Sequence, residues 1–361
     1  MTLEKIRKDA EDRFENLELP DSIRTPGRTW TRYPVMKDLE VSQSVEPDLS
    51  VEGEAEVFTG DEALEEAAGS FMDAVKRGEN RLTMLHFANV NSLVFVRAKG
   101  KAEVDVVYDE DSPVFAHLVV EADMNAEVDV TESFRGSSEV QTSFNEFYLG
   151  SNSTLNYGVI ESMDAELSYS RRKALVGRDA EMNWLNCVFD SDLNRTKIET
   201  VLKGDNSETE NIGIWYPVED QHFDIAMHVY HRGENTRCDM DSRAVVDDRA
   251  RSVYEGLQQV EEEAENTSSF QDEEVLLLSD EAEDDASPKL MIENPEVEAS
   301  HAASTGGLPE KELHYLKSRG LSEEEARKLI VKGYFEPVMQ KIQLPELKKT
   351  VREEVEKKLS R

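Results

Sequence analysis

The chain has 361 residues, of which 77 are Asp or Glu and 41 are Lys or Arg, giving a formal net charge of -36. Such an acidic protein is not expected to bind nucleic acid or an anionic membrane, because phosphate binding needs clustered Lys and Arg. The two cysteines, Cys187 and Cys238, are too far apart for a Cys-x-x-Cys metal clip and too few for a disulfide framework, which favours a reducing compartment.

The first residues, MTLEKIRKDAEDRF, carry charges throughout and contain no apolar stretch of the kind found in signal peptides. No later segment approaches the roughly 18 to 20 apolar residues that a membrane span needs. We therefore expect a soluble, cytoplasmic protein. A phosphate-binding loop of the G-x-x-x-x-G-K-[ST] type is also missing from the sequence, so any ATP hydrolysis must belong to a partner.

Helical periodicity marks the beginning of the chain. Apolar residues at three- or four-residue steps predict an amphipathic helix that Pro20 ends, and a second helical stripe closes before Gly78. The two stripes consist of Leu3, Ile6, Ala10, Phe14 and Leu17, and of Leu64, Ala67, Ala68, Phe71, Ala74 and Val75. An acidic stretch with little periodicity lies between them, so residues 1–92 are predicted to form a helical region with an acidic linker.

The period changes to alternation at about Leu93, as in LVFVRAKGKAEVDVVYDED. Similar short segments follow, and Gly, Asn or Asp turns separate them at intervals of roughly 10 to 14 residues. Many evenly spaced short strands fit either a β-sandwich or a β-solenoid with parallel rungs. Periodicity alone does not choose between the two, but it predicts a mainly β core over residues 93–305.

Helical stripes return after Thr305 and predict a C-terminal helical domain over residues 306–361. Ser322 and Glu325 have the spacing of a capping box, and Gly320 supplies a left-handed stop before it. Pro337 is expected to end or bend the helix that follows Tyr334. The final segment, VREEVEKKLSR, has few apolar anchors and is expected to be a solvated or partner-bound helix that frays.

Several motifs of this sequence resemble those of the SufB/SufD family of iron–sulfur cluster assembly proteins. The similarity covers about three quarters of the chain. It is carried by LLLSD at Leu276 to Asp280, the segment Pro288 to Ile292, the pair Ser300 and His301, LKSRGLSEEEARKLIVKG at Leu316 to Gly333, HRGENT at His231 to Thr236, RSVYEGL at Arg251 to Leu257, and RLTMLHFANVNSLVFV at Arg81 to Val96.

The resemblance implies a right-handed parallel β-helix flanked by N-terminal and C-terminal helical regions. It also implies that two family members pair through their β-helices, while the C-terminal helices of each bind an ATPase subunit, SufC. A nascent iron–sulfur cluster would be present only transiently at the paired interface, with no stably bound cofactor in this chain.

SufB-type members carry a Cys-Asp pair before the LLL strand and a His-Glu pair in the later motif. In this chain Glu273 and Glu274 stand at the first pair, and Ala302 follows His301. SufD-type members likewise keep only the histidine, so the chain resembles the SufD partner. The resemblance therefore implies a non-catalytic scaffold subunit that pairs with a SufB-type homologue.

His301 is the candidate cluster or iron ligand, because iron accepts imidazole as well as thiolate. The alternative for His301 is a hydrogen-bonded structural histidine at the end of the solenoid. Glu273 is a weaker candidate for an iron ligand, and we expect it to be a solvated charge within an acidic run.

Cys187, on an alternating strand, is expected to pack in the core. Cys238, between Arg237 and Asp239, is expected to be exposed, and the arginine would favour a thiolate with a speculative role in sulfur relay. His228 and His231 are three residues apart on a predicted strand, which places them on opposite faces and excludes a simple paired metal site.

The C-terminal helices expose more apolar surface than two short helices need for packing on each other, and the resemblance assigns part of it to ATPase docking. The candidate docking residues are Leu313, Tyr315, Leu316, Arg319, Leu329 and Ile330. Two other functions stay open: a homodimeric scaffold in which a second copy replaces the SufB-type subunit, and a β-helix carbohydrate-active enzyme using acidic residues.

Overall fold

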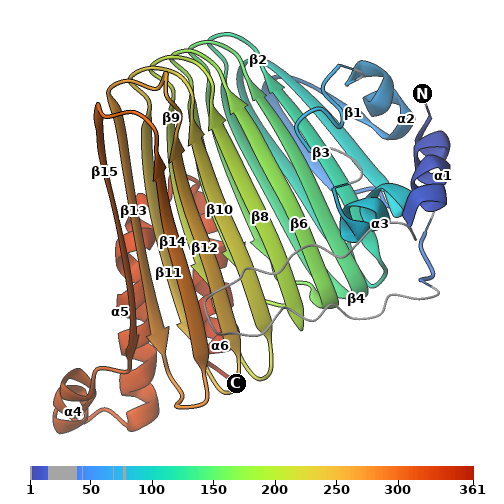
Figure 1. Ribbon diagram of the computed structural model, residues 1–361. Helices are drawn as coiled ribbons and strands as arrows, with labels where there is room; N and C mark the ends of the chain where they lie inside the picture. The colour runs from blue at the N-terminus through green and yellow to red at the C-terminus, as the bar shows by residue number, and fades with distance from the viewer. Residues whose placement is uncertain (1, 15–38, 43, 68, 76–78) are drawn as a thin grey trace.

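The computed structural model describes residues 2–14, 39–42, 44–67, 69–75 and 79–361. Of the residues used to predict the N-terminal elements, Leu17, Pro20, Ala68 and Gly78 lie outside this part of the chain. The body of the molecule is a parallel β-solenoid with helices at both ends of the chain (Figure 1). The prediction of a mainly β, β-helical core is confirmed, and the sandwich alternative is wrong.

The solenoid is built from fourteen consecutive strands. They are β2 (Ser92–Glu110), β3 (Val114–Ala122), β4 (Glu127–Leu149), β5 (Thr154–Glu161), β6 (Asp164–Val176), β7 (Glu181–Val188), β8 (Leu193–Leu202), β9 (Glu208–Trp215), β10 (His222–His231), β11 (Arg237–Val246), β12 (Arg251–Val260), β13 (Thr267–Leu277), β14 (Glu283–Ile292) and β15 (Val297–Gly307).

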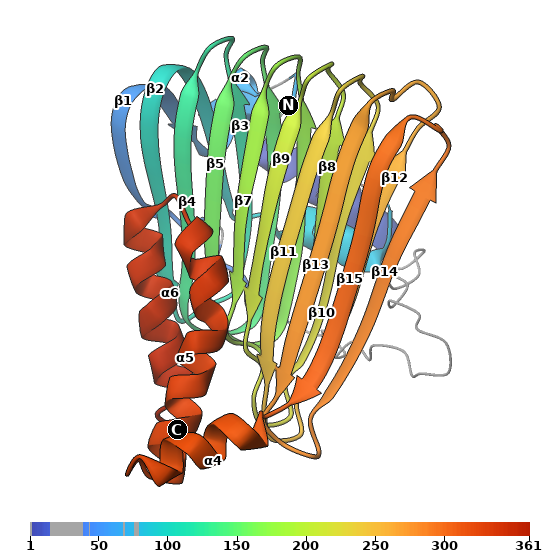
Figure 2. The same cartoon turned by 90° about the vertical axis from the view of Figure 1, so that its left-hand side faces the viewer.

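Strands alternate between two facing sheets. From β5 onward, each strand pairs in parallel with the strand two positions along the chain, so odd-numbered strands form one face and even-numbered strands the other (Figure 2). The long strand β4 joins the faces, because its first half pairs with β5 and its second half with β6. The chain therefore advances by one rung for every two strands, and each rung bonds only to its neighbours.

Stacked turns explain the regular Asn and Asp residues of the sequence. Asn125, Asn152, Asp179 and Asn206 have positive φ angles of 65°, 60°, 55° and 58°, and these residue types tolerate that conformation better than most. The Asn152 amide donates to Asn125 Oδ1 at 2.8 Å, and the Asn206 amide donates to Asp179 Oδ1 at 2.7 Å, across a step of 27 residues. The ladder fixes the register of successive rungs.

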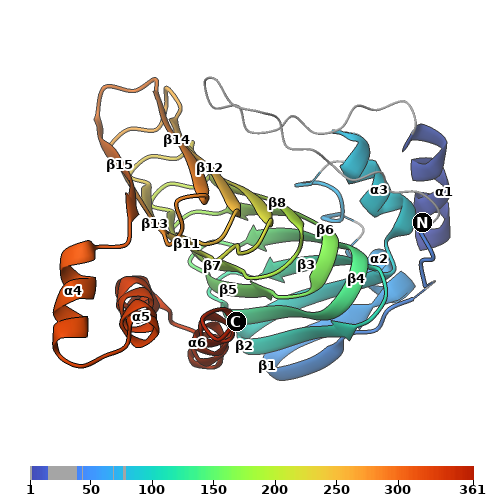
Figure 3. The same cartoon turned by 90° about the horizontal axis from the view of Figure 1, so that it is seen from below.

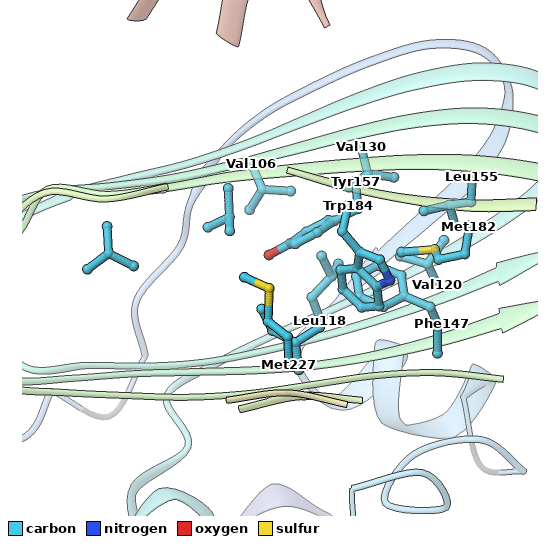
Figure 4. Packing of buried hydrophobic residues seen from close by; sticks show 14 of the residues in the cluster. Val106, Leu118, Val120, Val130, Phe147, Leu155, Tyr157, Met182, Trp184 and Met227 are labelled. Atoms are coloured by element: carbon cyan, nitrogen blue, oxygen red, sulfur yellow. The ribbon is translucent and has the colours of Figure 1, made fainter. Parts of the chain in front are cut away.

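Large side chains fill the space between the two sheets (Figure 4). Trp184 packs edge-on against Phe147 and Tyr157, with ring centroids 5.2 and 5.7 Å apart, and its indole N–H donates to Thr200 Oγ1 at 2.9 Å. Burial of the aromatic rings provides hydrophobic stabilisation, and the hydrogen bond satisfies the one polar atom of the indole. The interior is therefore a packed core.

The N-terminal region contains more strand than expected. Helix α1 (Leu3–Phe14) is confirmed, and Ile6 and Ala10 are buried. Helix α2 (Gly60–Glu66) is shorter than the predicted second stripe, whose later apolar residues pack from turns. The acidic stretch before it holds β1 (Asp48–Thr59), which pairs antiparallel with β2, so the linker prediction was wrong there. Helix α3 (Arg81–Asn89) leads directly into β2.

Three C-terminal helices follow the solenoid: α4 (Glu310–Ser318), α5 (Glu323–Lys341) and α6 (Pro345–Lys358). The Ser322–Glu325 capping box is present, and Gly320 has a φ of 102°, as predicted. Pro337 does not end α5, because the buried stripe that includes Phe335 and Val338 continues across it. The last helix, α6, buries Val351 and Val355, so the expectation that it frays is wrong.

Helices α5 and α6 lie along the outer face of the odd-numbered strands (Figures 2 and 3). Val351 and Val355 of α6 are buried there, and so is Leu347, which gives a stripe at four-residue steps. Gly158 on β5 makes close approach possible, because a Cβ at that position would lie 2.3 Å from Leu347 Cδ2. Helices α5 and α6 are thus part of the folded core.

The fit of α6 against Gly158 yields a prediction about stability. Gly158→Ala is expected to lower the free energy of unfolding by about 1 to 3 kcal/mol, because the added methyl overlaps Leu347 and Leu344. Chemical denaturation of the purified chain measures the change. Gly306→Ala is the control, since a Cβ there meets nothing within 4 Å. Equal stability of the two variants would contradict the packing described for α6.

Candidate functional site

The C-terminal end of the solenoid is open. Within the described residues, β14 pairs only with β12 and β15 only with β13, so each has one edge without a strand partner. Nearly all of β15 is exposed, and Phe270, Met291 and Ile292 are exposed large apolar residues at this end, at 38, 50 and 44 %. No helix covers the two edges in Figure 2. An uncovered pair of strand edges is a ready surface for pairing with another chain.

His301 lies on this open end. Its backbone is in register with Gln271 on β13, and neighbours in a parallel sheet point to the same face. Gln271 points inward, because a Cβ on Gly256 of the opposite sheet would lie 2.0 Å from its Nε2. His301 therefore continues the interior face one strand beyond the last covered rung, where its side chain is exposed. Its imidazole is accessible at the mouth of the solenoid.

Glu273 is buried, so the expectation of a solvated charge is wrong. The alternation of β13 turns Asp272 and Glu274 outward and Glu273 inward, and Glu273 is only 1 % exposed. Burial is the main cause that raises the pKa of Glu273 well above its ordinary value, and Asp284 and Asp272 add to the rise. The neighbouring acidic residues suggested a solvated charge. Strict alternation of inward and outward residues in SSFQDEEVLL would have indicated that Glu273 points inward.

Both cysteines are buried, but they lie in different hydrophobic clusters. Cys187 is buried in the cluster between the odd-numbered strands and α5 and α6, as predicted. Cys238 is also buried, at 3 % exposure, and the prediction that it is exposed was wrong. Its polar neighbours point outward while its own side chain points into the solenoid. Burial raises the pKa of both thiols, which opposes a reactive thiolate at either position. The sulfur-relay role of Cys238 stays a prediction.

His228 and His231 lie on opposite faces of β10, as predicted. His228 contacts Glu255 Oε1 at 2.9 Å on the outer face, whereas His231 contacts Thr236 Oγ1 at 2.8 Å and Ser269 Oγ at 3.0 Å inside. Within the residues that the structure describes, no three His, Cys, Asp or Glu side chains are arranged to hold a metal ion. Over the same residues, no helix has the length and apolar character needed to cross a membrane.

Four of the six candidate docking residues line a groove of about 540 Å³ between α4 and α5. Tyr315, Leu316, Leu329 and Ile330 line it, and Tyr315 and Leu329 are 55 and 49 % exposed. Arg319 lies over the Tyr315 ring at 5.1 Å, and Leu313 is half-buried. Helix α4 has no buried residue of its own, and its main packing partner within the described chain is α5. Of the four residues that line the groove, Tyr315 and Leu329 are exposed, whereas Leu316 and Ile330 are half-buried.

Comparison with known proteins identifies the family. A family model described as the SufBD core domain of the SUF system for iron–sulfur cluster assembly matches residues 106–334. The chain belongs to the SufBD family. It is 28% identical over 300 residues to the iron–sulfur cluster assembly protein SufD of Bacillus subtilis, covering 80% of this chain and 69% of the relative.

Two further SufBD relatives are similar over most of the chain. A SufBD family protein of Pyrococcus horikoshii is 30% identical over 299 residues, which cover 78% of this chain and 66% of the relative. One of Mycobacterium leprae is 26% identical over 261 residues, covering 70% of this chain and 66% of the relative. The matched part spans about two thirds of the relatives' own length. The assignment to the SUF system made from motifs is confirmed.

The buried His231 of this SufBD chain predicts a pH dependence of stability. Burial lowers its pKa from 6.5 to about 4. At pH values between these two, His231 binds a proton in the unfolded chain but not in the folded chain. Its contribution to the free energy of unfolding is therefore complete above the unfolded pKa and is lost as the pH falls through about 4. Between pH 7 and pH 5, wild type is expected to lose about 2 kcal/mol more unfolding free energy than His231→Asn.

Urea denaturation at the two pH values measures this difference. His314→Asn, at an exposed histidine of α4, serves as the control and is expected to follow the wild type. The same pH dependence in wild type and His231→Asn would show that His231 does not contribute.

Proposed function

We propose that this chain is a non-catalytic scaffold subunit of a cytoplasmic SUF complex, that it pairs with a SufB-type subunit through the open end of its solenoid, and that it binds a SufC-type ATPase on its C-terminal helices. The observation that carries the proposal is the position of His301, accessible at an uncovered end of a parallel solenoid. Membership in the SufBD family supplies the context of cluster assembly.

Pairing through β14 and β15 follows from their unfilled hydrogen-bonding capacity. Each rung inside the solenoid satisfies its backbone on both sides, whereas these two strands do so on one side only. A second subunit that added its own terminal strands would satisfy the edges through main-chain bonds. It would also cover Met291 and Ile292, whose exposure is costly in a free monomer. The end surface therefore suits a permanent partner.

The nature of the partner follows from the ligands that this chain can offer. Iron–sulfur clusters, which are the cargo here, are held mainly by thiolates. Both cysteines of this chain are buried, and burial raises the pKa of each thiol. A homodimer would bring the His301 imidazoles of both copies to the subunit interface, but it would provide no accessible thiolate there. A cysteine-bearing SufB-type partner supplies the missing donor, which favours the heterodimer over a pair of identical subunits.

ATPase docking is assigned to the groove between α4 and α5. Helices α5 and α6 bury their apolar faces on the solenoid, so the solenoid already uses that part of the C-terminal region. The groove residues Tyr315 and Leu329 stay exposed after this packing. An apolar patch framed by Glu312, Arg319 and other charged side chains is typical of a protein interface.

His301→Ala tests the ligand role. In a complex coexpressed with a SufB-type subunit and the ATPase, we expect the variant to assemble with normal stoichiometry but to yield several times less cluster, because the seam loses one donor. Anaerobic absorption spectroscopy with iron and sulfide analysis measures the yield. Ser300→Ala, the neighbour whose side chain points to the other face of β15, is the control. Wild-type cluster yield from His301→Ala would remove the ligand assignment.

Single charged substitutions test the docking groove. Removal of residues 308–361 is unsuitable, because it would uncover the face packed by α5 and α6. Tyr315→Glu or Leu329→Asp is expected to weaken ATPase copurification at least tenfold without changing the thermal midpoint, since both side chains are exposed. Met124→Glu is the matched control, because Met124 is 66 % exposed on a distant turn. Undiminished copurification would refute the assignment.

A further inference from the structure

The N-terminal end of the solenoid also has a free strand edge. Strand β1 pairs with β2 on one side, and within the described residues its other side has no strand partner. In Figure 2, β1 forms the left margin of the sheet and no strand lies beyond it. A bulge between Gly53 and Ala55 separates the first half of β1, residues 48–53, from the second half. The unpaired backbone groups of such an edge can bond to an added strand.

Side chains in the first half of β1 are exposed on both faces of the sheet. Leu49 lies opposite Val106 and Val51 lies opposite Val104, so both point to the inner face of the solenoid, as these core valines do. Val104 and Val106 are 0 % exposed, whereas Leu49 and Val51 are 37 and 42 % exposed. Exposure of apolar side chains that continue a core face costs free energy in water. A further strand on β1 would cover them.

The same strand is acidic. It contains no Lys or Arg, and its carboxylates are those of Asp48, Glu52, Glu54 and Glu56. Glu56 pairs with Lys99 at 2.5 Å, whereas the other three have no ion-pair partner among the described residues. Glu103 of β2 lies opposite Glu52. Partial burial raises the pKa of Glu103, and nearby negative charges, among them Glu52, add to the rise. The edge therefore favours a cationic partner.

We infer that the first half of β1, residues 48–53, is a docking edge for an extended basic segment of a partner protein. The segment would add a strand to β1 through main-chain hydrogen bonds. Because side chains alternate along a strand, its apolar residues would cover Leu49 and Val51 on the inner face. Its Lys or Arg residues would then lie beside Glu52 and Glu103 on the outer face. The occupant is a strand in which apolar and basic residues alternate.

A second copy of this chain fits the edge of β1 poorly. Pairing of β1 with β1 of another copy would place the carboxylates of both strands beside one another on the outer face, and like charges in such positions are destabilising. The strand β15 at the other end has only one acidic residue, Glu298, so the two ends suit different partners. A partner on β1 would not compete with the subunit pairing proposed for β14 and β15, and the inference does not rest on that pairing.

Binding of a fluorescein-labelled peptide of alternating Lys and Val to the purified full chain, followed by fluorescence anisotropy, tests the docking edge. Wild type is expected to bind in saturable fashion, and Val51→Glu and Glu52→Lys to bind at least fivefold more weakly. Both residues are exposed, so the thermal midpoint should not change. Glu298→Lys makes the same charge change on β15 and is expected to bind like wild type.

A control peptide with the same charge, in which Pro replaces two central Val residues, cannot pair along the strand and is expected to bind at least tenfold more weakly. Hydrogen exchange read by mass spectrometry locates the bound peptide. Residues 48–53 should exchange more slowly in its presence, whereas residues 297–307 on β15 should not change.

Three outcomes would overturn the inference. The first is a lack of saturable binding or of slower exchange in residues 48–53. The second is equal weakening by Glu52→Lys and Glu298→Lys, or equal affinity for the two peptides, which would indicate diffuse attraction to an acidic surface. The third is a dimer of the wild-type chain that light scattering detects and Glu52→Lys removes, which would assign the edge to a second copy.

Discussion

The stacking of parallel rungs is the constraint on which the rest of this molecule depends. Every strand of the solenoid satisfies its backbone through the rungs before and after it, so pairing is complete only in the interior of the stack. At the N-terminal end, β1 and the helices α1 to α3 cover the first rungs. At the other end β14 and β15 finish without a cover, and their edges face outward.

The same stacking decides which side chains can do chemistry. Alternation places Cys238 and Glu273 inside the solenoid, where burial suppresses the ionisation of both groups. His301 follows the same inward register, but the next rung that would bury it is missing. His301 is thus accessible because the stack of rungs ends beside it, whereas both thiols of the chain stay buried. This difference is the reason why the proposed cluster site needs a cysteine from another subunit.

Helices α5 and α6 add a second layer to one face of the solenoid and leave α4 projecting from it (Figure 3). Close approach at Gly158 and a buried stripe that runs through Pro337 hold this layer in place. A partner that binds α4 and α5 would therefore act on elements tied to the same sheet face as the odd-numbered strands. This arrangement offers a mechanical connection between the proposed ATPase dock and the open end, since β13 and β15 belong to that sheet.

The sequence by itself determined the class of the fold, the family and the helix caps, because alternation, the Asn and Asp turns and motifs such as Ser322–Glu325 are local signals. It also placed Cys187 in the core. The sequence did not show which side chains are buried by contacts with residues far away in the chain. Glu273 read as one charge in an acidic run, Cys238 as an exposed thiol, and residues 48–59 as a linker, because their environments are set by strands about 30 residues away or by β2. The sparse stripe of α6 is buried because it packs against the odd-numbered strands, where Gly158 allows close approach. Only the tertiary structure decided that the solenoid ends uncovered at His301, since an unpaired edge is a property of the whole stack.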